Sequence, residues 1–308
     1  MLDEKNYVLG ETRLPGGNGI NAARIVHRLG FPVELTGFLG GGVGVELKGL
    51  MDEEGLNSRF ISIIEPTRIS VTVSDLASHH QTRLSFSGPN ISPNEKEKLL
   101  SYARNLPRGS LVIVGGSLPP GMTPKILGDL FQILSENNCP FAIDVPGPIL
   151  GQILNDVFAS QFPALLIKPN LTEFQEALGT KATTLKEVVD SAKSLLDKIP
   201  LICVSSVNGG AVLVSNHGTW FGQIPEVKVK SSVGAGDSMV GAMCTLLNQW
   251  TFKTQNDREV GVAIKHQGQD LLRWGLAAAC ATLCVDGTQL GQKKEIEVFF
   301  KQIRIESI

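Results

Sequence analysis

The sequence predicts an α/β fold built on a doubly wound parallel sheet, and two patterns carry that prediction. The first is a set of continuous apolar runs of strand length, each followed by a cluster of Gly, Pro, Asp, Asn or Ser. Continuous rather than alternating apolar runs are typical of parallel strands that helices cover on both faces. The second is the helical spacing of the segments between the runs. The runs are Leu111–Val114, Phe141–Asp144, Ala164–Ile167 and Leu201–Val204.

Residues 60–88 interrupt this alternation and predict a small, separate β-sheet. Three short segments there alternate polar and apolar residues, and no helical pattern separates them. Elsewhere, Val33–Leu39 predicts a strand and Gly44–Glu54 a helix, whereas the polar residues 251–269 predict a surface segment between two helices. The three β segments are Phe60–Ile64, Ile69–Ser74 and Thr82–Phe86.

The composition is typical of a soluble globular enzyme and excludes several other classes. Of 308 residues, 42% are hydrophobic and 19% charged, which suits one large domain. A formal net charge of −2 provides no basic surface for nucleic acid or an anionic membrane. The five cysteines form no paired motif, as expected for reduced thiols of a cytoplasmic protein. We therefore expect no nucleic-acid partner and no membrane association.

The most informative stretch is SSVGAGDSMVGA, which spans residues 231–242. Gly234 and Gly236 allow a tight turn, and Asp237 is expected in the first turn of the following helix. A helix N-terminus presents unpaired N–H groups and a partial positive charge, so it can bind a phosphoryl group. Asp237 beside that group could take a proton from an attacking hydroxyl. The alternative is an ordinary acidic residue that starts a helix after a glycine turn.

An earlier glycine cluster, PGGNGINAA, runs from Pro15 to Ala23. Its Gly17-x-Gly19-x-x-Ala22 spacing formally matches a dinucleotide-binding fingerprint, but the polar residues before it do not predict the required buried strand. We interpret it as a loop whose backbone approaches a polyhydroxy ligand, with the Asn21 amide offering a donor and an acceptor. The alternative is a glycine-rich turn at the start of a helix.

Four further candidates follow or flank predicted strands. Ser117 could contact a ligand or belong to an ordinary turn. Asn170 with Glu173 could hold a hydrated Mg²⁺ or form a capping box, and both could be true. The backbone of Ser205–Gly210 could bend around a nucleotide phosphate, and Arg68 could clamp a substrate phosphate.

Taken in order, five motifs resemble the PfkB/ribokinase family of sugar kinases. They are GGNGINAARIVHRLG, TRISV, GGSLPPG, KPNLTEF and SVGAGDSMVGA, and the resemblance runs from about Gly10 to the C-terminus. It is to the phosphofructokinase and tagatose-phosphate kinase branch of that family. It implies a single ribokinase-like domain over residues 1–308, with a β-sheet lid formed by about residues 7–14 and 60–88. It also implies a first core strand that ends before Met1, so we expect this strand to be missing from the chain and two sheet edges to be unpaired.

The resemblance implies phosphoryl transfer from MgATP to a hydroxyl of a sugar phosphate. It makes Asp237 the catalytic base and the amides of Gly234, Ala235 and Gly236 the anion hole. It places Mg²⁺ at Asn170 and Glu173, the nucleotide at Lys168, Ser205 and Gly210, and the sugar phosphate at Gly17, Asn21, Arg68 and Ser117. A monovalent cation such as K⁺ is a further expected cofactor, to which we assign no ligands. Lids of this family often pair across a homodimer.

Within the branch we expect fructose 6-phosphate as the acceptor, with fructose 1,6-bisphosphate as the product. Fructose 1-phosphate is the closest alternative, and tagatose 6-phosphate follows. An alternative from another class is an inactive protein that binds sugar phosphate and nucleotide.

Overall fold

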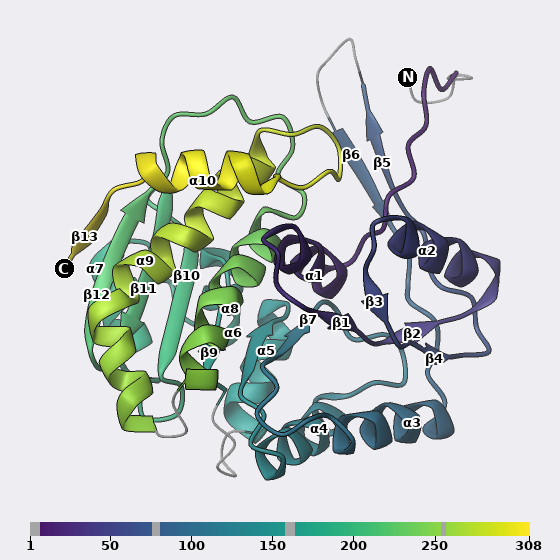
Figure 1. The fold of residues 1–308 in the computed structure, drawn as a ribbon, viewed down its shortest axis with the longest axis horizontal. Helices are drawn as coiled ribbons and strands as arrows, with labels where there is room; N and C mark the ends of the chain where they lie inside the picture. The colour runs from purple at the N-terminus through teal and green to yellow at the C-terminus, as the bar shows by residue number, and fades with distance from the viewer. Residues whose placement is uncertain (1–6, 76–80, 158–163, 254–256) are drawn as a thin grey trace.

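The computed structural model describes residues 7–75, 81–157, 164–253 and 257–308, and a seven-stranded sheet lies at its centre (Figure 1). The spatial order of the strands is β13-β12-β11-β10-β9-β8-β7. Strands β7 to β10 pair in parallel, and β11 to β13 extend the sheet in antiparallel pairs. The predicted α/β class is confirmed, although the sheet is parallel over only part of its width. The strands are β7 (Val112–Gly115), β8 (Phe141–Asp144), β9 (Leu166–Ile167), β10 (Leu201–Val207), β11 (Gly210–Ser215), β12 (Gly218–Gln223) and β13 (Ile305–Ser307).

Helices cover both faces of this sheet because its strands carry apolar side chains on both sides, and every residue of β8 is buried. On one face lie α1 (Asn18–Arg28), α8 (Ala235–Lys253), α9 (Asp257–Leu283) and α10 (Lys293–Gln302). On the other lie α4 (Pro124–Glu136), α5 (Gly147–Gln152), the π-helix η1 (Ile153–Val157), α6 (Leu171–Leu178) and α7 (Leu185–Lys193). None of the described helices is long and apolar enough to cross a membrane.

The segment expected as a surface connection, residues 251–269, is mostly helical. Helix α8 continues to Lys253 and α9 begins at Asp257, while residues 254–256 lie outside the described part. The prediction was wrong because the many polar residues of this segment hide its helical pattern, although α9 carries buried apolar residues from Ile264 onward.

Strand β7 forms one end of the central sheet. Within the described residues it pairs only with β8, and Val112, Ile113 and Val114 are half-buried. The sequence predicted that both faces of this strand are buried. It did not predict the edge position, because a continuous apolar run does not reveal how many neighbours a strand has.

The N-terminal third of the chain forms small parallel pairs beside α2 (Gly41–Glu53). Strand β1 (Glu34–Leu35) pairs with β3 (Asn57–Ser58), and β2 (Phe38–Leu39) pairs with β4 (Ile61–Ser62). The predicted strand Val33–Leu39 is thus broken in two, with Gly37 at a φ of 150° between its halves.

Strands β5 (Ser70–Ser74) and β6 (Gln81–Ser85) form an antiparallel hairpin that stands away from the central sheet (Figure 1). The expected lid also included Ile61–Ser62, which instead pairs with β2, and residues 7–14, which form no helix or strand. Residues 76–80 of that lid lie outside the described part. The separate sheet is therefore narrower than the sequence suggested. Helix α3 (Pro93–Arg104) follows it and packs on α4.

Helix α1 packs closely on α8 because Gly241 has no side chain. A Cβ atom on Gly241 would lie 2.5 Å from the backbone oxygen of Ala22. This close approach sets the distance between the N-terminal turns of the two helices, where the conspicuous glycine clusters of the sequence lie.

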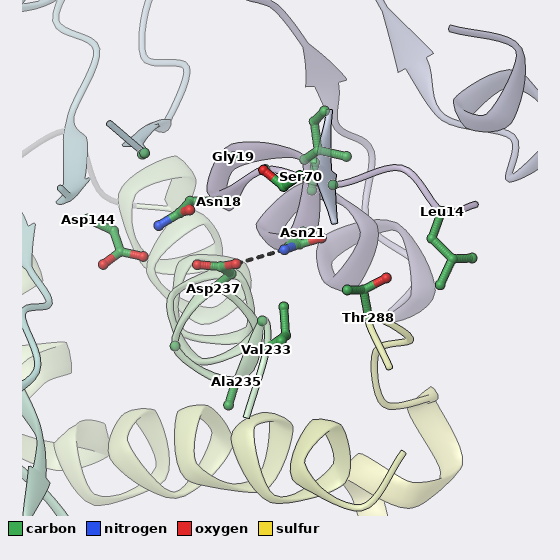
Figure 2. Close-up of a pocket in the computed structure, with 18 of the residues that line it drawn as sticks. Leu14, Asn18, Gly19, Asn21, Ser70, Asp144, Val233, Ala235, Asp237 and Thr288 are labelled. Atoms are coloured by element: carbon green, nitrogen blue, oxygen red, sulfur yellow. Dashed lines mark hydrogen bonds between the residues drawn. The ribbon is translucent and has the colours of Figure 1, made fainter. Parts of the chain in front are cut away.

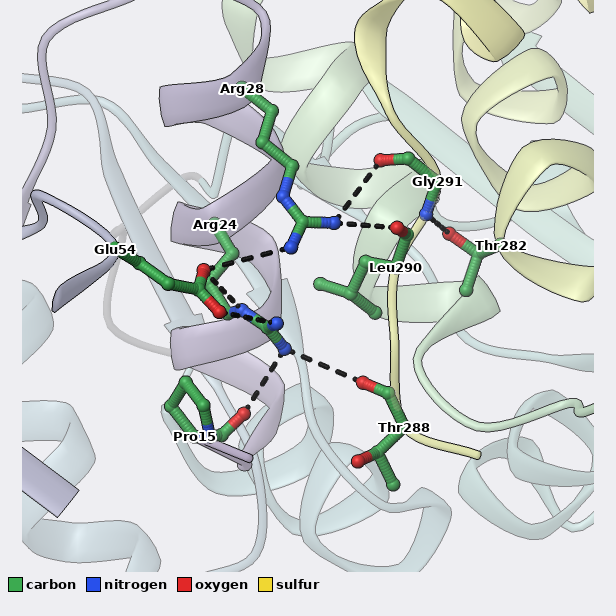
Figure 3. A network of polar contacts seen from close by, with 8 residues as sticks. All are labelled: Pro15, Arg24, Arg28, Glu54, Thr282, Thr288, Leu290 and Gly291. Carbon is green, nitrogen blue, oxygen red and sulfur yellow. Dashed lines mark hydrogen bonds and ion pairs between the residues drawn. The ribbon is translucent and has the colours of Figure 1, made fainter. Parts of the chain in front are cut away.

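A buried arginine network holds α1 to the segments around it (Figure 3). Arg24 is 1% exposed and donates through Nε and Nη2 to both carboxylate oxygens of Glu54, at 2.8 and 2.6 Å. Its Nη1 donates to the backbone oxygen of Pro15 at 3.2 Å. One turn later, Arg28 donates to the backbone oxygen of Leu290 at 2.6 Å. The network joins the first glycine cluster, the end of α2 and the loop after α9.

Substitution of Gly241 by Ala should lower the free energy of unfolding by about 1–3 kcal/mol, because the added methyl group would collide with backbone. Gly49 in α2 is a matched control with open space around it, so Gly49→Ala should raise stability by roughly 0.5–1 kcal/mol. Urea denaturation of both variants measures this, and equal effects would contradict the close packing of α1 on α8.

Candidate active site

All of the site residues that the sequence predicted line one open cavity of about 3510 Å³. It lies where β8, β9 and β10 end, as expected for ligand sites in open α/β sheets. Its volume exceeds the 300–1,000 Å³ or so of a single small-molecule pocket because it extends from the sheet to the β5–β6 hairpin and residues 7–14. The lining includes Gly17, Asn21, Arg68, Ser117, Lys168, Asn170, Glu173, Ser205, Gly210, Gly234, Ala235, Gly236 and Asp237.

The second glycine cluster forms the tight turn that the sequence predicted. Gly234 has a φ of 79°, which favours glycine, and helix α8 begins at the next residue, Ala235. The backbone oxygen of Gly234 accepts the N–H of Ser238 at 2.8 Å. The N–H groups of the first turn have no partners inside the helix and can receive an anion.

Asp237 lies in the first turn of α8, between Asn21 on one side and Asp144 on the other (Figure 2). Its Oδ2 accepts a hydrogen bond from Nδ2 of Asn21 at 2.8 Å. Burial and the negative charge of Asp144 raise the pKa of Asp237 to about 6, against the lowering effects of the Asn21 hydrogen bond and of Lys168. Asp237 is therefore ionised near neutral pH and can accept a proton there.

An ion pair that the sequence analysis did not anticipate holds Lys168 beside Asp144. The Nζ of Lys168 lies 3.1 Å from Oδ1 of Asp144, and the two residues are only 3% and 6% exposed. Burial by itself would lower the pKa of Lys168, but the charge and hydrogen bond of Asp144 outweigh it and the pKa is raised. A Cβ on Gly236 would lie 3.1 Å from Nζ, so the ammonium lies against the anion-binding turn.

Asn170 and Glu173 form a capping box at the start of α6. Oδ1 of Asn170 accepts the N–H of Glu173, and Oε2 of Glu173 accepts the N–H of Asn170, both at 2.9 Å. The capping alternative is confirmed. Burial raises the pKa of Glu173, which the hydrogen bond from Asn170 opposes.

These residues are chemically suited to Mg²⁺ even though the described residues contain no cluster of three or more His, Cys, Asp or Glu side chains for a metal ion. Mg²⁺ is usually held by one or two carboxylates together with substrate phosphates and water, so a closed protein cage is not needed. Glu173 lines the cavity and supplies hard oxygen donors, and a capping role does not occupy all of its lone pairs.

The predicted nucleotide side lies next to this box. The N–H of Ser205 donates to the backbone oxygen of Pro169 at 3.0 Å, and Ser205 forms a parallel bridge with Asn170. Gly210 is buried where β10 turns into β11, and a Cβ there would lie 1.9 Å from the backbone oxygen of Gly222. Glycine is therefore required at position 210 by packing.

The structure brings together two predicted residues of the sugar-phosphate side, which are 49 positions apart in the sequence. Arg68, just before β5, donates through Nη2 to Oγ of Ser117 at 3.1 Å, in the loop after β7. Gly17 caps α1 with a φ of 128°, a conformation open mainly to glycine. The hydrogen bond to Ser117 holds the Arg68 guanidinium beside a hydroxyl in the lining of the cavity, an arrangement suited to a phosphate group.

Asp144 is the main residue of the site that the sequence analysis missed. It had been noted only as the end of an apolar run, whereas Lys168 at the end of the next run had been given a ligand role. Strands β8 and β9 are parallel neighbours, so their ends meet at one edge of the sheet. An acidic residue and a basic residue at the ends of two neighbouring predicted strands were therefore the sequence signal that could have revealed this ion pair.

Comparison with known proteins gives consistent similarities along the whole chain. The sequence pattern of the pfkB family of carbohydrate kinases matches residues 2–295. The ATP-dependent 6-phosphofructokinase isozyme 2 of Mycobacterium tuberculosis is 32% identical over 292 residues, which are 93% of this chain and 79% of that protein. The 1-phosphofructokinase of Bacillus subtilis is 26% identical over 305 residues, 99% of this chain and 91% of that protein.

Solved structures agree with these sequence matches. The structure of phosphofructokinase-2 from Escherichia coli in complex with potassium is similar with a TM-score of 0.84 and 26% identity, covering 97% of this chain and 93% of that one. The same enzyme in complex with substrates and products gives a TM-score of 0.81 and 27% identity, covering 97% and 93%.

Substitution of Lys168 by Met should lower the free energy of unfolding by about 3–5 kcal/mol, because it leaves Asp144 as a buried, unpaired charge. Lys230 is the matched control, since its pair with Asp286 is 43% and 77% exposed. Lys230→Met should change stability by less than about 1 kcal/mol. Guanidinium denaturation compares the two variants, and a similar small loss in both would show that the Asp144–Lys168 pair is not buried as described.

Proposed function

The chain belongs to the pfkB family of carbohydrate kinases, and on that premise we propose that it transfers the γ-phosphoryl group of ATP to fructose 6-phosphate. It is thus a phosphotransferase with an alcohol group as acceptor, and fructose 1,6-bisphosphate is the proposed product. The observation that carries the proposal is the position of Asp237, an ionised carboxylate within the first turn of α8 and beside its unpaired N–H groups.

The site residues divide this reaction among themselves. We assign the base to Asp237 and the stabilisation of the transferring phosphoryl group to the amides of Gly234, Ala235 and Gly236. We assign Lys168, Ser205 and Gly210 to the nucleotide side. The ammonium of Lys168 lies against the anion-binding turn and would act through its charge. Gly17, Asn21, Arg68 and Ser117 are assigned to the sugar-phosphate side.

We propose Mg²⁺ and K⁺ as cofactors. Asn170 and Glu173 would hold Mg²⁺ through water, and the ion would neutralise charge on the phosphates of ATP. For K⁺ the support is a solved structure of the family with potassium, from phosphofructokinase-2 of Escherichia coli. We assign it no ligands.

Two relatives bear on the choice of sugar phosphate. The Mycobacterium tuberculosis relative named a 6-phosphofructokinase is 32% identical, against 31% for the 1-phosphofructokinase of Escherichia coli. These identities do not separate the two sugars. The support for fructose 6-phosphate is the similarity to phosphofructokinase-2 of Escherichia coli solved in complex with fructose-6-phosphate, at a TM-score of 0.80 and 25% identity, and fructose 1-phosphate is the specific alternative. Arg68 with Ser117 suits a phosphate on either sugar.

We further propose a homodimer formed through the β5–β6 hairpin. Val71, Val73 and Leu84 of this hairpin are 40%, 50% and 48% exposed, which is a large apolar surface for a two-stranded sheet. A second hairpin pairing with it would bury that surface. A cytoplasmic location is proposed because all five cysteines are free thiols, as is typical of a reducing compartment.

A coupled assay of ADP release tests the proposed activity. With Mg²⁺ and ATP we expect turnover of fructose 6-phosphate with a higher kcat/KM than fructose 1-phosphate or tagatose 6-phosphate. Asp237→Asn should lower kcat by about 10²- to 10⁴-fold, because the amide cannot accept the proton of the attacking hydroxyl. Circular dichroism and thermal unfolding check that the variant folds. Near wild-type turnover in this variant would remove Asp237 as the base, and a folded wild type without turnover on any sugar would favour a binding role.

The proposed dimer predicts a mass of twice the 33.1 kDa chain in light scattering. Val71→Lys should convert the dimer to monomer, because it places a charge on the apolar face of the hairpin. Val298→Lys is a control on α10, where Val298 is 47% exposed and far from the hairpin in the fold, and it should leave the mass unchanged (Figure 1). A monomeric wild type at micromolar concentration would contradict the proposal.

A further inference from the structure

Two buried hydroxyl groups join α8 to α9 next to the anion-binding turn. Ser238 follows the proposed base in the first turn of α8, and Thr282 lies near the end of α9. Both residues are 0% exposed, and their hydroxyl oxygens are 2.8 Å apart, where either can donate. Oγ1 of Thr282 also accepts the N–H of Gly291 at 3.1 Å (Figure 3). We call these three residues the hydroxyl link.

The far end of the hydroxyl link lies against the anion-binding turn. Leu290, which precedes Gly291, is 1% exposed, and a Cβ on Gly234 would lie 2.6 Å from its Cδ2. Leu290 is not among the described residues that line the cavity, so it supports Gly234 from behind. Arg28 on α1 holds the same segment through the backbone oxygens of Leu290 and Gly291, at 2.6 and 3.4 Å (Figure 3). The turn is therefore supported both through Ser238 and through Leu290.

The surroundings of the hydroxyl link are apolar, which makes the two hydroxyl groups informative. Met239, Met243 and Ala278 belong to the buried core cluster in which α8 packs on α9. An apolar pair would pack there without the desolvation that a buried hydroxyl group costs. Apolar contacts are non-directional, however, whereas a hydrogen bond has a preferred distance and angle. The hydroxyl link therefore defines an orientation of α8 on α9 that apolar contacts alone do not.

The orientation of the first turn of α8 matters because its N–H groups belong to the backbone and cannot adjust one by one. The N–H of Ser238 donates to the backbone oxygen of Gly234 at 2.8 Å, so Ser238 closes the turn that contains Gly234, Ala235 and Gly236. Such donors stabilise a transferring group only within hydrogen-bond distance of the oxygens on which charge develops. A displacement of about 1 Å can lower a rate by about 10²-fold. A shift of Ser238 would thus displace all three amides.

We propose that Ser238 and Thr282 are positioning residues, whose hydroxyl groups hold the amides of Gly234, Ala235 and Gly236 toward the transferring phosphoryl group. This inference rests on the proposed function of that turn as the anion hole. Both hydroxyl groups are fully buried, so they act through the turn and not by touching a substrate. Their effect falls on the transition state more than on substrate binding, because the anion hole stabilises charge that develops during the transfer.

Two substitutions of Thr282 separate this role from simple packing. Thr282→Val keeps the shape and removes the hydroxyl group, whereas Thr282→Ser keeps the hydroxyl group and removes the methyl group. We expect Thr282→Val to lower kcat by about 10-fold and to change KM for either substrate by less than about twofold, because the amides remain but are displaced. Thr282→Ser should retain most of kcat. Equal kcat in the two variants, or a loss in Thr282→Val that lies in KM, would overturn the proposal.

A substitution of Ser238 tests whether the two hydroxyl groups act as a unit. Ser238→Ala removes the hydrogen bond to α9 and leaves the bond from Gly291 to Thr282 in place, so kcat should fall here too. The double variant Ser238→Ala/Thr282→Val should lose no more kcat than Thr282→Val alone, because both changes remove the same hydrogen bond. Losses that multiply in the double variant would show two independent effects and contradict the proposal.

Amide hydrogen exchange, followed by NMR, needs no turnover and distinguishes this proposal from the proposed function. The Ser238 amide reports opening of the turn, because its N–H closes it. In Thr282→Val we expect this amide to exchange about 10-fold faster relative to the Met243 amide farther along α8, and in Thr282→Ser at nearly the wild-type rate. An unchanged ratio in Thr282→Val overturns the proposal. If the wild type phosphorylates no sugar, the proposed function fails, and faster exchange would still support the link between the hydroxyl groups and the turn.

Ser215 provides a matched control for the loss of a buried hydroxyl group. It is 5% exposed, and its Oγ donates to the backbone oxygen of Gly218 at 3.0 Å and accepts the N–H of His217 at 3.1 Å. It is not among the described residues that line the cavity. Ser215→Ala should leave kcat and the exchange of the Ser238 amide unchanged, and a loss of kcat as large as in Thr282→Val would overturn the proposal. Thermal unfolding checks that each variant folds, and if Thr282→Val is unfolded then Ser238→Ala carries the kinetic comparison.

Discussion

The close contact of α1 with α8 is the constraint on which the site depends. Gly241 allows the backbone of Ala22 to lie against α8, and this fixes the N-terminal turns of both helices at one cavity. The hydrogen bond from Asn21 to Asp237 follows directly from that approach. Arg24 and Arg28 reinforce it from the outer side by binding the end of α2 and the loop after α9. Two loops that are distant in the sequence thereby form one rigid support.

A group of charged residues that line the cavity is the second feature on which the site depends. Asp144, Glu173 and Asp237 are three carboxylates in partly or fully buried positions, with the ammonium of Lys168 among them. Burial of so many ionisable groups is unfavourable unless they pair, and the Asp144–Lys168 contact provides the closest pair. Burial and the remaining negative charge together raise the pKa of the proposed base.

Much of the local structure could be predicted from the sequence, because it depends on residues that are close along the chain. Glycines before an acid predicted the start of α8, and Asn170 with Glu173 predicted a capping box that the structure contains. Continuous apolar runs predicted the core strands β8 to β10. The assigned ligand roles of these residues remain proposals, since local pattern does not identify a ligand.

Pairing between segments far apart in the sequence was decided only by the tertiary structure. The edge position of β7 and the Asp144–Lys168 ion pair depend on which strands are neighbours, and a strand's own residues do not specify its neighbours. The start of α9 was mistaken for a surface connection because its many polar residues hide the helical pattern, although the helix carries buried apolar residues from Ile264 onward. The sequence by itself determined the helix starts, the tight turns and the buried strands, through local backbone preference and hydrophobicity. The fold decided the partner of each charged side chain, since a Coulomb interaction depends on distance in space.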